Sequence, residues 1–530
     1  MRAGLQFASS EDEKQVTVRN NWQPKPGDKF VRRPRVKAHP LRRVLGIPGL
    51  YSVGYGNVGS SIYYALGIVT FVAMGATPVV LAIAGIFFIF TALTYAEGTA
   101  MLPEAGGSAS FARHGFNDSV GFIAGWALML SYIVTIAISA FVIPPYLGYF
   151  WAPLKESAAV STAVSMGIIF FLMIINVVGV RQTSFLNVAA AALDLLVQIL
   201  IIALGLLVVF NFDVLAHNVT FYWPSWDNLI LGVALAAIAY TGVETMSQMA
   251  EETKRPAIRV PKALILMIIT VLILFGGVST VGLSAMTPQE LATSWSTDPI
   301  AGIAHSISSA ITPEEMATGL SSEKEAVIVL TWIFTWLRNL LPALVAILAA
   351  SILLIATNAG LMGISRLAFS LGRFQLIPLA LSRVHHQFKT PYISIILFAT
   401  VALLILVPSF FAPNEFIKLG ALYAFGSLLS FSLAHASILK LRIKDSSSPR
   451  PFKLGWNIKL KQWEMPITAV LGLAGTVAIW LVVIFTQPYS RWVGLGWMAV
   501  GLGVYFLFRW RKQLPLSQVA KAASSGRSPR

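Results

Sequence analysis

Long apolar runs, separated by short polar or basic segments, dominate the chain. The runs are about 20 residues long, which is the length that a helix needs to cross a hydrocarbon core about 30 Å thick. They show no alternation with a period of two, which a membrane-spanning β-barrel would require. Because a helix satisfies its own backbone hydrogen bonds in lipid, the pattern predicts an all-α membrane protein.

The apolar pattern predicts twelve spans between residues 45 and 510. Their approximate limits are 45–73, 78–100, 120–149, 162–180, 185–210, 229–250, 263–285, 336–363, 392–411, 416–441, 466–485 and 492–508. The eighth span is the least well defined, because the apolar stretch 326–363 is too long for one crossing. We expect the first part of that stretch to lie on the outer surface.

An even number of spans places both ends of the chain on one side of the membrane. With that arrangement, five of the 39 Lys and Arg residues fall on the opposite side, namely Lys155, Lys324, Arg338, Lys418 and Arg491. Cytoplasmic loops carry an excess of Lys and Arg, so we expect both termini to be cytoplasmic. The two tails, 1–44 and 511–530, are polar and basic, and this composition is typical of disordered segments.

Composition and charge agree with a membrane protein. The chain is 56% hydrophobic and 12% charged, whereas soluble domains carry roughly 25% charged residues. The net charge of +16 would suit nucleic-acid binding, but the basic residues lie between apolar runs and in the tails, where topology signals lie. We therefore expect membrane lipid and not nucleic acid as a partner.

The chain lacks the residue patterns of other functional classes. It contains no cysteine, which excludes disulfide and thiol chemistry. Its seven histidines are scattered, so no cofactor or metal is expected and a membrane enzyme is disfavoured. A channel would need a selectivity filter, and no repeated filter sequence is present.

Two spans carry glycines where a helix could be interrupted. The first contains Gly54–Ser61, with three glycines, each of which lowers helix stability by about 1 kcal/mol relative to alanine. The sixth contains Tyr240–Glu244, in which Gly242 lies near a carboxylate. Matched interruptions in two halves are typical of secondary transporters, which bind substrate there. Close helix packing by small residues is the alternative for the first span.

Further short motifs follow one another along residues 45–510. In chain order they are Tyr95-Ala96-Glu97 with Pro103–Ser108, Gly125-Trp126 with Ser131-Tyr132, Asn176–Arg181, Tyr240–Glu244 with Glu251–Pro256 and Val260-Pro261, and Ser365-Arg366 with Gly372-Arg373, Ile377-Pro378 and Thr390-Pro391. With this order and spacing the chain resembles the amino acid–polyamine–organocation (APC) transporter superfamily.

The resemblance implies a specific architecture and activity. It implies a LeuT-like fold with two inverted repeats of five helices, at about 45–210 and 229–441, followed by two added helices at about 466–508. It implies a secondary active transporter in the plasma (inner) membrane that works by alternating access and is not an enzyme. Members commonly carry amino acids or polyamines, and one branch imports potassium.

The resemblance also places the substrate at the two interruptions. The predicted binding residues are Gly56, Asn57, Val58, Gly59, Ser60, Ser61, Ile62, Tyr132, Tyr240, Thr241 and Gly242. Potassium carriers have acidic residues where Asn57 and Ser131 fall here, and a polyamine would need more carboxylates than the spans contain. An amino acid is therefore the favoured substrate, with potassium and polyamines as the alternatives.

Asp194 and Glu244 are the predicted ion-coupling residues. A carboxylate in the middle of a span, such as Asp194 in the fifth, costs roughly 2.5–3.5 kcal/mol on insertion scales. In proton-coupled relatives a lysine often lies at what resembles this position. A buried carboxyl can exchange protons near neutral pH, so we expect proton coupling. The alternatives are a bound cation, or a neutral aspartic acid that links the fifth span to the first or eighth. Ile355-Ala356 stands where sodium-coupled relatives offer hydroxyls, so sodium is not expected.

Overall fold

The computed structural model describes residues 43–179, 184–320, 324–388, 390–410, 415–446, 448–460 and 463–517. Of the two predicted tails, only 43–44 and 511–517 are among the described residues, and Val180 and Arg181 of the fourth-span motif lie outside them.

Helices account for most of the described chain. The helices that form the apolar stretches are α1 (Ile47–Val58), α2 (Ile62–Ala73), α3 (Thr77–Met101), α5 (Asp118–Leu147), α7 (Ala158–Val178), α8 (Ser184–Leu204), α10 (Trp226–Ala236), α11 (Glu244–Gln248), α12 (Pro256–Ala285), α16 (Lys324–Arg373), α17 (Tyr392–Leu406), α18 (Glu415–Lys444), α19 (Ile467–Thr486) and α20 (Pro488–Arg511). Shorter helices connect them: α4 (Ser108–Gly115), α6 (Pro153–Glu156), α9 (Phe212–Phe221), α13 (Pro288–Thr293), α14 (Pro299–Ala310) and α15 (Pro313–Leu320).

Eleven stretches of the described residues are long and apolar enough to cross a membrane. The first of them, Ile47–Met101, has 55 residues, and a straight helix of that length would extend about 80 Å, more than twice a hydrocarbon core. The chain turns inside it at Met74, whose φ is +47°, so the stretch contains the first two predicted spans. The fold is thus an all-α membrane protein, as predicted.

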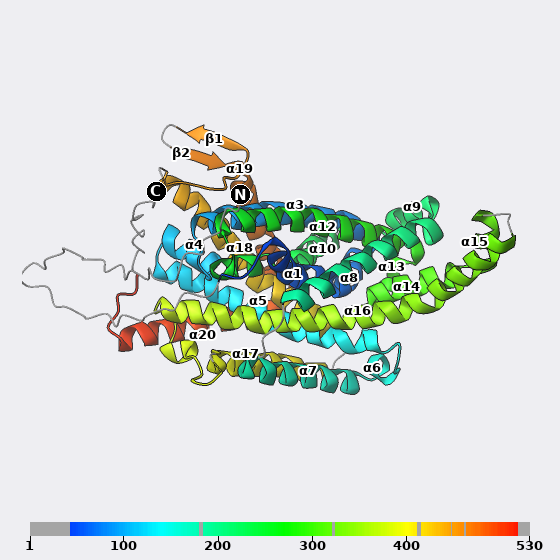
Figure 1. Ribbon diagram of the computed structural model, residues 1–530. Helices are drawn as coiled ribbons and strands as arrows, with labels where there is room; N and C mark the ends of the chain where they lie inside the picture. Colours follow the sequence, from blue (N-terminus) through cyan, green and yellow to red (C-terminus); the bar gives the residue numbers. More distant parts are fainter. Residues whose placement is uncertain are drawn as a thin grey trace, which may run out of the picture. The chain divides into compact units, whose positions relative to one another are not determined.

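The eighth predicted span differs from the expectation. The stretch 326–363 does not divide into a surface segment and a crossing, because one continuous helix, α16, runs through it for 50 residues. Pro342 lies inside this helix without ending it. In Figure 1, α16 starts beside α15 and runs along the bundle towards the opposite end.

Local sequence signals explain where several of these helices begin and end. The Asn117 side chain accepts a hydrogen bond from the Val120 N–H at 3.0 Å and caps α5, which satisfies one of the free donors of the first turn. Helix α7 ends at Gly179, whose φ of +78° suits glycine in a left-handed cap. Helix α12 begins with Pro256, a residue that suits the first helical turn.

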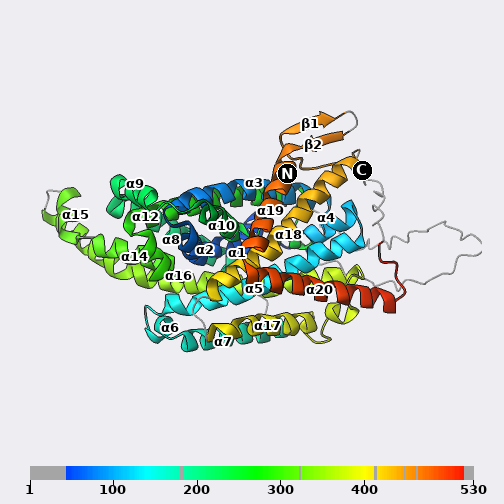
Figure 2. The ribbon, with the colours of Figure 1, turned by 180° about the vertical axis from the view of Figure 1, so that it is seen from behind.

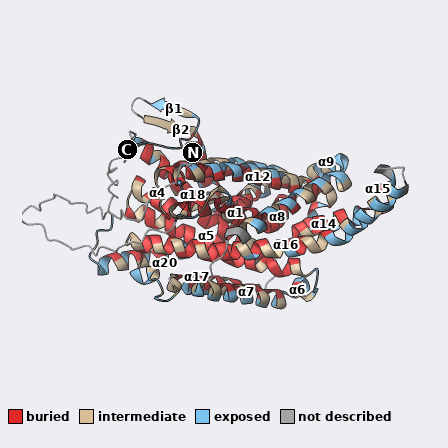
Figure 3. Ribbon diagram, in the orientation of Figure 1, coloured by how far each residue is buried: buried red, intermediate tan, exposed pale blue. Residues whose placement is uncertain are grey.

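Helix α5 forms the core of the described bundle and is buried along nearly its whole length (Figure 3). It packs against α16, α18, α4 and α7. Helices α7 and α17 lie side by side along one edge in both views (Figures 1 and 2). Most residues of α7, α19 and α20 are not buried, and in a membrane their apolar side chains would face lipid.

A short β-hairpin, which the sequence analysis did not predict, separates α18 from α19. Strand β1 (Asn457–Leu460) pairs antiparallel with β2 (Trp463–Pro466), and Lys459 lies opposite Glu464. Strand β2 leads directly into α19 at Ile467.

Candidate functional site

The sixth span is interrupted at the predicted glycine. Helix α10 tightens into a 3-10 turn at Ala237–Tyr240, and the chain then extends at Thr241 before α11 begins. Gly242 has a φ of +109°, a conformation that residues with a Cβ rarely adopt. Its N–H donates a hydrogen bond to Glu244 Oε2 at 3.0 Å. The interruption therefore brings a carboxylate against free backbone inside the bundle.

The first span is interrupted less deeply than predicted. Helices α1 and α2 are joined by one 3-10 turn, Gly59–Ser61, whose neighbouring backbone stays right-handed. The hydroxyls of Ser60 and Ser61 donate to the Asn57 carbonyl at 3.1 and 3.4 Å. The expected unwound segment is thus a single tight turn, because two serine hydroxyls and the 3-10 pattern satisfy its backbone.

Asn57 joins the two interruptions. Its Nδ2 donates to Thr245 Oγ1 on α11 at 2.7 Å. A Cβ on Gly242 would lie 2.7 Å from that Nδ2, so only glycine at position 242 lets the sixth-span interruption approach Asn57 of α1 this closely. Asn57, Gly242 and Glu244, predicted from separate spans, therefore come together.

Several of the buried polar atoms that have no hydrogen bond of normal geometry among the described residues belong to the helices around this contact. They are Asn57 Oδ1, Tyr95 OH, Ser131 Oγ, Tyr132 OH, Tyr423 OH, and Gln248 Oε1 and Nε2. Most buried polar groups in native proteins are hydrogen-bonded, so each exception needs an explanation such as water or a ligand. Their clustering beside two interrupted helices is the pattern of a binding site for a polar solute.

Glu244 supplies the carboxyl group of this polar cluster. The hydroxyls of Tyr95, Tyr132 and Tyr423 lie close enough for its charge to act on them. Among the described residues no Lys, Arg or His lies within ion-pair distance of its carboxylate. A carboxylate that is buried without a cation is expensive, and a cationic group of a bound solute would offset that cost.

Other predicted binding residues have different surroundings. Gly56 faces Ile355 of α16, whose Cγ2 would lie 3.0 Å from a Cβ at position 56. Val58 and Ile62 are buried apolar residues of the core. The Thr241 hydroxyl donates to the Ile238 carbonyl at 2.8 Å, so this side chain stabilises the turn.

The predicted role of Tyr240 is only partly compatible with its position. Its hydroxyl donates to the Leu81 carbonyl of α3 at 2.8 Å, and its ring stacks on Phe88. It lines a cavity of about 20 Å³ together with Thr91 and Phe431, which holds one water at most. The hydroxyl of Tyr240 is thus already satisfied.

Asp194 lies in a second polar cluster, on α8. Its Oδ1 accepts a hydrogen bond from Tyr63 at 2.6 Å, and its Oδ2 accepts from Tyr55 and from Gln198 Nε2, both at 2.8 Å. Tyr55 and Tyr63 stand on opposite sides of the 3-10 turn in the first span, so Asp194 links α8 to both α1 and α2. A Cβ on Gly59 would lie 2.6 Å from the Tyr55 ring, which makes this glycine necessary for the contact.

The sequence analysis did not single out these partners. Gln198 could have been found, because it lies one helical turn after Asp194 and therefore on the same face. Tyr55 and Tyr63 flank the glycine-rich segment, but nothing in their spacing shows that both point towards the fifth span.

Ion pairs join the helices near both ends of the bundle. At the end that carries the hairpin, Arg373 and Arg366 of α16 pair with Glu251 (2.7 Å) and Glu252 (2.9 Å), which follow α11. These pairs connect the segment after the sixth-span interruption to α16, so a movement of that segment must break them.

At the other end, Lys155 Nζ pairs with Asp298 at 2.7 Å and lies 3.7 Å above the Trp295 ring centre. Burial raises the pKa of the Asp298 carboxyl to about 6, although Lys155 opposes the shift. The carboxyl is therefore ionised and paired above about pH 6, and below that pH a neutral carboxyl accepts a hydrogen bond from the Lys155 ammonium without an ion pair. Among the described residues no group of three or more His, Asp or Glu side chains could hold a metal ion.

Comparison with known proteins agrees with this architecture. A family model described as amino acid permease matches residues 45–507. The chain is 26% identical to the branched-chain amino acid permease BcaP of Bacillus subtilis, over 90% of this chain and 95% of the relative. It is 27% identical to the methylthioribose transporter of the same organism (89% and 94%) and 23% identical to the low-affinity putrescine importer PlaP of Escherichia coli (88% and 94%). The match over most of the chain confirms the predicted resemblance, and the chain belongs to the amino acid permease family.

Proposed function

We propose that this multi-pass permease carries an amino acid across the plasma (inner) membrane by alternating access, coupled to protons, with both termini in the cytoplasm. The observation that carries the proposal is the polar cluster at the two interruptions. The family match supports a carrier of organic solutes, and the charge distribution of the loops supports the orientation.

An amino acid is complementary to this cluster. Its ammonium group would offset the buried charge of Glu244, which has no cationic partner among the described residues. Its carboxylate would accept hydrogen bonds from hydroxyls such as those of Tyr132 and Ser131, which are buried and unpartnered. This assignment differs from the expectation that backbone N–H groups near Ser60 and Ser61 bind the carboxylate, because that segment is a closed 3-10 turn.

A polyamine is the second candidate, because one relative is a putrescine importer. A diamine carries two separated cations, and each would require an anionic partner when it is desolvated. Around the two interruptions Glu244 is the one carboxylate that belongs to the polar cluster, since Asp194 is engaged with Tyr55, Tyr63 and Gln198. The charge count therefore favours a substrate with one ammonium group and one carboxylate.

Helix contacts support the proposed inverted repeat. In three of the five predicted counterpart pairs, α3 with α12, α5 with α16, and α7 with α17, the two helices pack against one another. Pairing of equivalent helices is expected when two repeats are related by an axis that passes between them. The first and sixth spans, which are also counterparts, meet through Asn57 and Thr245.

Uptake into proteoliposomes tests the proposed substrate. We expect radiolabelled uptake of one or more amino acids to saturate and to show counterflow, because a carrier exchanges internal for external substrate. The panel would include neutral, acidic and basic amino acids, putrescine and rubidium as a potassium substitute. Saturable uptake of putrescine or rubidium without uptake of any amino acid would contradict the proposal. Uptake without counterflow would contradict a carrier mechanism.

A further inference from the structure

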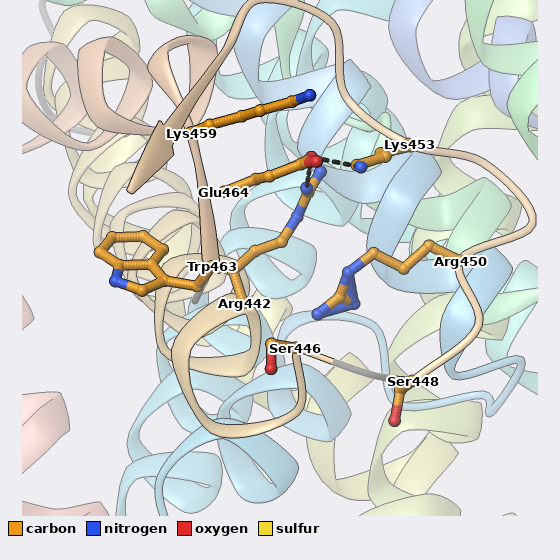
Figure 4. A pocket seen from close by; sticks show the side chains of 8 residues that line it. All are labelled: Arg442, Ser446, Ser448, Arg450, Lys453, Lys459, Trp463 and Glu464. Carbon is orange, nitrogen blue, oxygen red and sulfur yellow. Dashed lines mark ion pairs between the residues drawn. The ribbon is translucent and has the colours of Figure 1, made fainter. Parts of the chain in front are cut away.

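A cavity of about 550 Å³ lies between the β-hairpin and the end of α18 (Figure 4). Its lining residues are mostly basic or hydroxylic: Arg442, Ser446, Ser448, Arg450, Lys453, Lys459, Trp463 and Glu464. Four of them are cations and one is a carboxylate, so the lining carries an excess of positive charge. The permease mechanism described above uses none of them.

Two arginines form the rigid floor of this hairpin cavity. The side chains of Arg442 and Arg450 are 3% and 6% exposed. Arg442 donates to both oxygens of Glu97 at 2.6 Å, and Arg450 donates to the carbonyls of Leu441 and Asp445 at 3.1 Å. Their positions are therefore fixed by the protein, and Glu97 neutralises only part of their charge.

Two lysines lie nearer the solvent. Lys453 pairs with Glu464 and is 45% exposed, and Lys459 stands opposite Glu464 in the hairpin. Figure 4 shows both ammonium groups on the side of the cavity where Glu464 lies. The hydrogen bond from Lys453 lowers the pKa of the Glu464 carboxyl below its usual value, as expected in a positive field. Glu464 and Glu97, with Asp445 acting on Arg450, leave part of the charge of the four cations unbalanced, so an anion would be stabilised here.

The opposite face of strand β1 is apolar. Ile458 and Leu460 are 45% and 38% exposed, and alternate residues of a strand point to the same face. Strand β2 leads into α19 at Ile467 and the hairpin follows the end of α18 at Lys444, so its position is at the membrane surface. An element with one apolar and one cationic face suits the boundary between headgroups and acyl chains.

We propose that the hairpin cavity binds the phosphate of an anionic phospholipid from the adjacent leaflet. The lysines would contact the phosphate, the positive charge of the arginine floor would stabilise it from below, and the apolar face of Ile458 and Leu460 would contact acyl chains. A free phosphate shares the first set of contacts and lacks the second. The proposal is independent of the transported substrate.

Native mass spectrometry of the full-length protein in detergent tests the proposal with short-chain phosphatidylglycerol and phosphatidylcholine as probes. We expect the wild-type protein to bind phosphatidylglycerol at least tenfold more tightly, because the choline ammonium is repelled by the cavity. The double variant Lys453→Gln/Lys459→Gln should weaken phosphatidylglycerol binding about thirtyfold, from the loss of two interfacial cations. The matched control Lys440→Gln/Lys512→Gln removes two exposed lysines from α18 and the end of α20 and should bind as the wild type does.

A comparison of lipid with inorganic phosphate distinguishes a phospholipid headgroup from free phosphate as the ligand. Ile458→Ser/Leu460→Ser should weaken phosphatidylglycerol binding, and inorganic phosphate should compete only at far higher concentrations than the lipid. Unchanged phosphatidylglycerol binding in Lys453→Gln/Lys459→Gln would overturn the proposal. Inorganic phosphate that binds as tightly as the lipid would assign the cavity to a soluble phosphate and overturn the lipid assignment.

Discussion

Gly242→Ala is expected to lower the initial rate of substrate exchange at least about thirtyfold. The alanine must adopt a φ of +109°, which costs on the order of 1–3 kcal/mol for a residue with a side chain. Its Cβ would also lie 2.7 Å from Asn57 Nδ2 and 3.2 Å from the Asn57 carbonyl carbon. Asn57 would have to move and lose its hydrogen bond to Thr245, which is worth about 1 kcal/mol. Each 1.4 kcal/mol that disfavours the contact between the two interruptions lowers the population of molecules able to exchange substrate by a factor of ten.

Gly167→Ala is the matched control for that substitution. Gly167 lies in α7, where nothing approaches within 4 Å of a built Cβ, and its replacement should leave exchange unchanged. Both variants would be compared by counterflow in proteoliposomes at equal amounts of monodisperse protein. Exchange at the wild-type rate in Gly242→Ala would show that transport does not depend on the contact between the two interruptions.

Asp194→Asn is expected to abolish accumulation driven by a proton gradient while substrate exchange persists. The substitution keeps the shape of the side chain and removes its ability to gain and lose a proton. Because Tyr55 and Tyr63 hold Asp194 to both halves of the first span, a change in its charge would alter the balance of donors at the 3-10 turn. The amide NH₂ that Asp194→Asn introduces would face a donor of Tyr63, Tyr55 or Gln198. A buried donor left without an acceptor there would destabilise the protein by about 1–3 kcal/mol.

The measurement is uptake at several external pH values, with and without an imposed proton gradient. A purely structural aspartic acid would give a different result, in which accumulation and exchange fall together and the remaining transport keeps the wild-type pH dependence. Asp213→Asn, at an exposed position of α9, is the control. If accumulation in Asp194→Asn depends on pH as it does in the wild type, the coupling role is refuted.

Much of the fold could be predicted from the sequence, because lipid imposes strong rules on the chain. The length and apolar character of the runs predicted the spans to within a few residues, as for α5 and α19. Prediction from the length of apolar runs fails where a helix is longer than the membrane is thick. The apolar stretch of α16 was too long for one crossing, but its hydropathy did not indicate that the extra residues continue the same helix.

The candidate site was predicted less completely. Glycine and a nearby carboxylate identified the sixth-span interruption, because Gly242 has a backbone conformation that few other residues adopt. The first span was predicted to unwind, yet Ser60 and Ser61 satisfy its backbone locally. The glycine pattern there also serves close contact, since Gly59 makes room for Tyr55.

Side-chain partners from distant spans were beyond the sequence analysis. Tyr95 and Gln248 contribute unpartnered polar atoms to the cluster, but tyrosine and glutamine also occur in ordinary helix packing. Which face of each helix points inward depends on how the helices pack, and no local pattern determines it. The hairpin was missed for a related reason, because its strands are only four residues long.

Substrate protection of a single cysteine tests most directly whether the polar cluster binds substrate. The chain has no cysteine, so Ser131→Cys places one thiol at an unpartnered hydroxyl of the cluster, and Ser139→Cys places one further along α5 at another buried, unpartnered hydroxyl. A small thiol reagent should modify Ser131→Cys during transport cycles, and a saturating amino acid substrate should slow that reaction at least about tenfold without protecting Ser139→Cys to the same degree. Equal labelling rates of Ser131→Cys with and without substrate would contradict a binding site at the two interruptions.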